Sequence, residues 1–63
     1  MENNLTKLEA KRREKQMSRR ELAEKVGITY EAVMYYEKGA REPRASILKR
    51  IAEVLGCTME ELI

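Results

Sequence analysis

Basic side chains gather in two stretches of this 63-residue chain, and lysine and arginine are the residues that bind phosphate groups. Residues 11–20 carry six of them against one acid, Glu14, and residues 38–50 carry five against Glu42. The net charge of the chain is only +2, so the distribution of charge is more informative than its total. If the two stretches lie together in space, they form a surface for the phosphates of a nucleic acid. The alternative is that both are solvated helix faces, as most runs of charge are.

The residue types give little support for other chemistry. The chain has no histidine and one cysteine, so it can form neither a Cys/His zinc cluster nor an internal disulfide. No nucleophile stands beside a base, and we expect no enzyme activity, no metal, no cofactor and no small-molecule ligand. No apolar run approaches the about 20 residues that a membrane span needs. An unpaired cysteine without an export signal predicts a cytoplasmic protein.

Capping residues and glycines divide the chain into five predicted short helices of a single domain, residues 1–63, with residues 1–4 frayed. The first helix is predicted from about Leu5 to Lys15, with Asn3 or Asn4 as its cap. Hydroxyl caps that open later helices and glycines that end helices are Ser18, Thr29, Thr58, Gly27, Gly39 and Gly56. The clearest amphipathic pattern is that of the fourth helix, through Ile47, Leu48, Ile51, Ala52 and Leu55. No segment alternates as a strand does, so the predicted fold class is all-α.

Seven positions between residues 22 and 36 match the requirements of two helices joined by a tight turn. Ala23 is small where the helices must cross, and Gly27 can take the positive φ that keeps the turn short. The remaining five are apolar and face a shared core: Leu22, Val26, Ile28, Val33 and Tyr36. This pattern predicts a helix-turn-helix whose second helix, beginning near Thr29, lies in the major groove of DNA.

The sequence also resembles the phage-repressor and Cro-type helix-turn-helix domains, often called XRE-type. The resemblance covers about residues 5–63 and rests on RREKQMS (12–18), ELAEKVGI (21–28), YEKG (36–39), Pro43, IAEVLG (51–56) and TMEEL (58–62). It implies a compact five-helix domain like that of the lambda repressor. Such domains usually act as dimers on a palindromic operator.

The resemblance also implies roles for individual residues. Base edges would be read by Tyr30, Glu31 and Tyr35, with Met34 nearer the margin of that face. Phosphates would be bound by Arg19, Arg20, Thr29, Lys38, Arg41 and Arg44. Helical spacing agrees, because Val33 and Tyr36 point inward and leave the other side of this helix outward. The chain departs from the family at Arg19, where glutamine is common, and at Tyr30 and Glu31, where amide or basic residues are common.

Two of these departures leave alternatives open. Glu31 can accept a hydrogen bond from cytosine N4 and so select that base. It can equally do no more than stabilise the N-terminus of its own helix through the helix dipole. Tyr30 and Tyr35 can touch thymine methyl groups or donate to phosphates, or they can form a contact with another protein.

Other residues receive structural roles. The resemblance implies an internal ion pair between Arg12 and Glu37, and Arg12 falls on the apolar side of the first helix. Met59, Leu62 and Ile63 are more apolar than one short helix needs. We expect them to form a homodimer interface, the alternative being that they pack on the first helix.

Together these features predict a sequence-specific double-stranded DNA-binding protein, acting as a transcriptional regulator, a repressor, through a homodimer on an operator. We expect a bacterial or phage protein in the cytoplasm, associated with the nucleoid. The competing hypothesis is a protein-interaction module with the same fold, such as an antitoxin or the partner of a regulator.

Overall fold

Every regular element in residues 6–63, the part of the chain that the computed structural model describes, is a helix. The elements are α1 (Lys7–Glu14), α2 (Arg19–Val26), α3 (Tyr30–Lys38), α4 (Ala45–Leu55) and the 3-10 helix η1 (Met59–Leu62). The predicted all-α class is confirmed, but residues 6–63 form four α-helices and not the five predicted. In the last segment the amide of Glu61 donates to the backbone oxygen of Thr58 at 3.1 Å, which is the i→i+3 spacing of a 3-10 helix.

The first helix begins later than the sequence suggested. The Thr6 hydroxyl accepts a hydrogen bond from the amide of Glu9 at 3.2 Å, so Thr6 is the N-cap and the predicted start at Leu5 is wrong. The proposed caps Asn3 and Asn4, the burial of Leu5 and the fraying of residues 1–4 lie outside the described residues. The helix ends before Gln16, which takes a left-handed φ of 57°.

The turn between α2 and α3 is built as the sequence predicted. The Ser18 hydroxyl caps α2 by accepting from the amide of Glu21 at 3.0 Å. Gly27 ends α2 with a φ of 88°, a left-handed conformation that is strained for any residue with a Cβ. Thr29 then opens α3 by accepting from the amide of Ala32 at 3.0 Å. Each local signal therefore sets one boundary of the helix-turn-helix.

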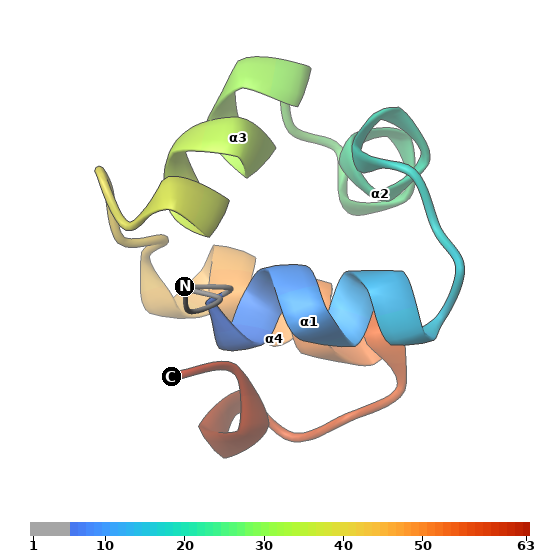
Figure 1. Ribbon diagram of the computed structural model, residues 1–63. Coiled ribbons are helices and arrows are strands. Elements are labelled where there is room, and N and C mark those ends of the chain that lie inside the picture. Colours follow the sequence, from blue (N-terminus) through green and yellow to red (C-terminus); the bar gives the residue numbers. More distant parts are fainter. Residues whose placement is uncertain (1–5) are drawn as a thin grey trace, which may run out of the picture.

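Helix α4 supplies the largest share of the core. Ile51 and Leu55 on α4 are almost completely inaccessible to solvent, as are Leu22, Val26 and Val33 from the helix-turn-helix. Burying a side chain of this size contributes about 1.5–3 kcal/mol. Helix α2 packs against both α3 and α4, while α1 contacts α3 and η1. Figure 1 shows α2 and α3 above α1 and α4, with the C-terminal segment running below them.

Candidate nucleic-acid interface

Helix α3 has one side in the core and one side in solvent. Val33 is completely buried and Glu37 is 2% exposed, whereas Tyr30 is 42% and Tyr35 39% exposed. Glu31 is also exposed, and Met34 is half-buried at the margin of this side. The four predicted base-reading residues therefore share the outward side of α3, with Met34 the least accessible of them.

The helix-turn-helix positions lie as the geometry of the motif requires. Its apolar residues are either buried (Leu22, Ala23, Val26 and Val33) or half-buried against the core (Ile28 and Tyr36). The amides of both Gly27 and Ile28 donate to the backbone oxygen of Ala23, at 2.8 and 3.0 Å. These two bonds close the end of α2, so the chain reverses within three residues and α3 packs on α2.

Four of the predicted phosphate-binding cations are exposed, namely Arg20, Lys38, Arg41 and Arg44. The Arg41 guanidinium lies 5.3 Å from the centre of the Tyr35 ring, a cation–π arrangement. Arg41, which is predicted to bind a phosphate, and Tyr35, which is predicted to read a base, are therefore in contact with each other. The oxygen of Thr29 is exposed and already accepts the capping bond from the amide of Ala32.

The fifth cation, Arg19, lies in a different environment. Its side chain is 29% exposed, and its Nε donates to Glu37 Oε1 at 2.8 Å. This contact raises the pKa of the Arg19 guanidinium, and the Tyr30 hydroxyl raises it further. Residues 19 and 37 are far apart in the sequence and no short motif links them, so sequence reasoning placed Arg19 only as a phosphate ligand. Only the packing of α2 on α3 brings the two residues together.

The structure brings Arg12 and Glu37 together, as the resemblance implied. Arg12 Nε donates to Glu37 Oε2, Arg12 Nη2 donates to Oε1 at 3.2 Å, and Arg12 Nη1 donates to the backbone oxygen of Met17 at 2.8 Å. The Arg12 side chain is 10% exposed and that of Glu37 is fully buried. All three guanidinium nitrogens are bonded, so this buried charge is compensated.

The predicted dimer interface is only partly available. Leu62 is 8% exposed and belongs to the core of its own chain, so it offers little surface to a second copy. Met59 is half-buried against the same core, while Ile63 is 71% exposed. The reason is that η1 folds back on α1 and α4, where Lys11 also forms an ion pair with Glu61 at 3.5 Å.

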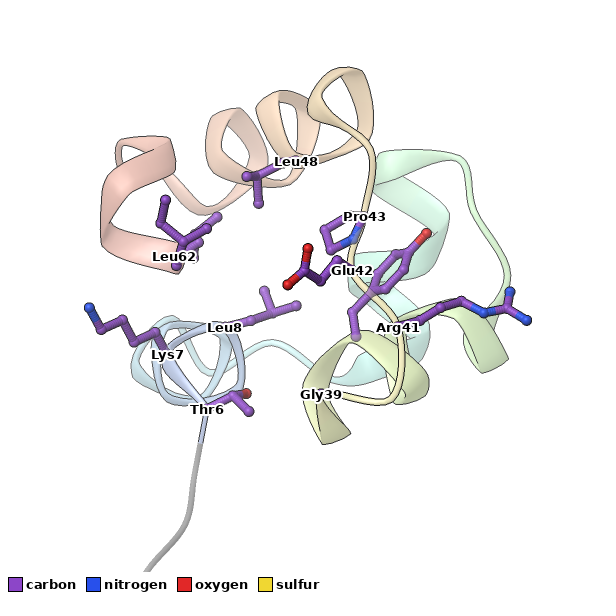
Figure 2. A pocket seen from close by; sticks show the side chains of 11 residues that line it. Thr6, Lys7, Leu8, Gly39, Arg41, Glu42, Pro43, Leu48 and Leu62 are labelled. Carbon is purple, nitrogen blue, oxygen red and sulfur yellow. The ribbon is translucent and has the colours of Figure 1, made fainter.

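A cleft of about 560 Å³ adjoins this C-terminal segment. It lies between α1, the loop after α3, α4 and the end of the chain, as Figure 2 shows, with Leu8 and Leu48 on opposite sides of it. Leu62 closes one end of the cleft in Figure 2. Ile63, the next residue in the chain, also lines it. The wall is mainly apolar, and Arg41, which lies over Tyr35, forms part of it.

A domain with α2 and α3 joined in this way, and with α3 exposed on one side, is a helix-turn-helix domain. The family model described as Helix-turn-helix matches residues 8–62, nearly the whole chain. The chain therefore belongs to the XRE-type helix-turn-helix family, a family of DNA-binding domains of transcription regulators. No curated protein and no solved structure gives a significant match to it. In residues 6–63, no helix has both the length and the apolar character needed to cross a membrane.

Proposed function

We propose that this domain binds double-stranded DNA sequence-specifically and represses transcription by occupying an operator as a homodimer. The observation that supports this is the outward side of α3, where Tyr30, Glu31 and Tyr35 are exposed and Arg41 lies against Tyr35. Helix α3 enters the major groove with this side against the base edges. The exposed cations Arg20 on α2, Lys38 at the end of α3 and Arg44 after it bind the phosphates on either side of that groove.

The pairing of two copies gives the operator its symmetry. Ile63 is the most exposed large apolar side chain among residues 6–63, and it stands at the edge of the apolar cleft. We expect a second copy to cover Ile63. The interface predicted from the sequence is larger and also includes Leu62. The α3 helices of two copies paired in this way should contact half-sites about 34–36 Å apart.

Titration of a random-sequence duplex with increasing salt tests the DNA-binding proposal. Because each neutralised phosphate contributes a slope of about −0.9 to the log–log plot, the five cations of one subunit give about −4 to −5. Fluorescence anisotropy of a labelled duplex measures the dissociation constant at each salt concentration. A flat response would contradict DNA binding. It would favour the protein-interaction alternative, for which the exposed Tyr30 and Tyr35 are the supporting observation.

Glu31→Gln tests how the operator sequence is read. If Glu31 accepts from cytosine N4, glutamine should reduce the preference at one base pair by about 1–3 kcal/mol and leave the other positions unchanged. Selection of bound sites from a random DNA pool measures the preference at every position, and also shows whether the site is palindromic. Glu24→Gln on the exposed side of α2 is the matched control. An unchanged site with a stability loss of about 0.3–1 kcal/mol would mean that Glu31 serves only the helix dipole.

A further inference from the structure

One buried carboxylate joins three helices of this domain. The Glu37 side chain on α3 is fully buried, and its two oxygens accept three hydrogen bonds from arginines on α1 and α2. Two cations, Arg12 and Arg19, therefore share one anion. The next carboxylate, that of Glu9, stands 4.0 Å from Arg12 and 3.9 Å from Arg19, and it makes its short contact with Arg13 at 2.8 Å. With three arginines and two carboxylates, the cluster keeps one positive charge.

The two arginines that share Glu37 differ in what remains available on each. Arg12 uses Nε, Nη1 and Nη2 and is almost inaccessible to solvent. Arg19 donates to Glu37 through its Nε alone, and its side chain stays 29% exposed. Of its terminal nitrogens, Nη2 stands 3.9 Å from Glu9 Oε2, and the Tyr30 hydroxyl also lies near the guanidinium. The surplus charge of the cluster is therefore on the arginine that solvent, or a ligand, can reach.

A guanidinium held in this way is suited to one ligand geometry. Its two terminal nitrogens form a planar fork that matches two oxygens of a phosphate. When Nε is bonded to a fixed carboxylate, the fork loses less conformational freedom on binding. Glu37 does not cancel the charge, because Arg12 already neutralises it.

We propose that Glu37 is a positioning residue for DNA binding, which accepts the Nε–H of Arg19 and so presents the Arg19 Nη1 and Nη2 groups as a preset fork for one backbone phosphate. This inference rests on the proposed function and adds to it the means by which a buried residue acts at the interface. It also gives a physical reason for arginine at position 19: a glutamine there has one N–H left once it is bonded to Glu37, and it has neither a positive charge nor a two-nitrogen fork. The raised pKa of Arg19 is in keeping with these contacts.

The test compares charge removal and charge retention at position 19 in the salt titration described above. Arg19→Gln should reduce the steepness of the log–log slope by about 0.9, the value for one phosphate. Arg19→Lys keeps the charge and hence the slope, but the three N–H donors of an ammonium group diverge from one nitrogen and do not form the planar fork that matches two phosphate oxygens. It should weaken binding about tenfold at fixed salt, the loss expected for one charge-assisted hydrogen bond. Arg13→Gln is the matched control, because Arg13 belongs to the same cluster but bonds only Glu9 and is 59% exposed.

A double-mutant cycle addresses Glu37 itself. Glu37→Gln should weaken DNA binding in the wild-type background and have little effect in the Arg19→Gln background, if it acts on DNA through Arg19. Thermal unfolding of each variant defines the temperature at which all are folded and comparable. If Glu37→Gln does not fold, the Arg19→Lys result decides, because Arg19 is partly exposed and its replacement leaves the Arg12–Glu37 pair in place.

The outcomes separate this inference from the proposed function. A steep wild-type slope with an unchanged slope in Arg19→Gln would overturn the phosphate contact and leave DNA binding intact. Arg19→Lys binding as tightly as the wild type would overturn the role of the preset fork. A flat wild-type response would overturn the proposed function and this inference with it.

Discussion

Glu37→Leu is expected to remove most of the stability of the domain at 25 °C. The substitution leaves the guanidinium of Arg12 buried without its carboxylate, and breaking a buried pair in this way costs about 3–5 kcal/mol. A domain of 63 residues has a total stability of about 3–9 kcal/mol, by the usual range per residue. Chemical denaturation followed by circular dichroism measures the free energy of unfolding. The same substitution at Glu24, exposed on α2, should change it by less than about 0.5 kcal/mol.

The double replacement Arg12→Met with Glu37→Leu shows whether the cost arises from the unpaired charge. Replacing both partners of a buried pair by apolar residues of similar volume is often neutral or stabilising. The double variant should therefore recover most of the stability that Glu37→Leu loses. It should still bind DNA less tightly than the wild type, because Arg19 has lost its positioning carboxylate. A single variant as stable as the wild type would contradict the view that the Arg12 charge needs Glu37.

The results expected for the single and the double variant distinguish two roles of Glu37. Glu37 contributes to stability through Arg12, which is inaccessible, and to binding through Arg19, which is not. Arg12 bonds both oxygens of the carboxylate and Arg19 bonds only Oε1, so Arg19 can be replaced while the Arg12–Glu37 pair is kept. Substitution of Arg19 tests binding with little change in folding, and the double replacement at positions 12 and 37 restores folding without the binding role.

The helix boundaries that could be predicted from the sequence are those with a local physical cause. A hydroxyl at Ser18 or Thr29 captures an amide three residues later, and both helices start there. Glycine at 27, 39 and 56 adopts the left-handed conformation that ends a helix, and three helices end there. Neither kind of signal depends on the rest of the molecule.

Boundaries with competing local candidates were predicted less well. Thr6, Asn3 and Asn4 are all good caps, and sequence alone does not rank them; the structure uses Thr6. At the end of α1 the left-handed residue is Gln16, a type that gives no signal of a helix end. The fifth helix is predicted from the hydroxyl cap Thr58, and this cap does form, but the four residues that follow make a 3-10 helix.

The candidate site also has features that the sequence predicts and features that it does not predict. Helical periodicity identified which side of α3 is outward, because that depends only on the positions of Val33 and Tyr36. It could not show that Arg19 bonds Glu37 or that Arg41 lies on Tyr35, because both contacts join separate elements. It also could not tell Leu62 from Ile63, which differ only in whether η1 turns the side chain toward α1.

Leu62→Ala is the second substitution with a large expected effect, and it depends on this difference. Because Leu62 is 8% exposed within one chain, its truncation leaves a cavity beside α1 and should cost about 2–5 kcal/mol. Against a total of about 3–9 kcal/mol, this brings the domain close to its unfolding threshold. Ile63→Ala is the matched control, because a side chain that is 71% exposed contributes little to the fold of one copy. Thermal and chemical unfolding at low protein concentration measure both.

Self-association should depend on Ile63 more than on Leu62, which is the reverse of the order expected for stability. If a second copy covers Ile63, then Ile63→Ala should weaken the dimer in sedimentation equilibrium and make DNA binding require more protein, while the unfolding of the monomer stays unchanged. Leu62→Ala should lose stability whether or not the protein dimerises, because the contacts that it removes lie within one chain. A wild type that is monomeric at every concentration, with and without a palindromic duplex, would contradict the proposed dimer and leave the stability prediction for Leu62 intact. Equal stability losses in the two variants would instead mean that Ile63 packs within its own chain, and the apolar cleft beside it would then have no exposed residue to offer a second copy.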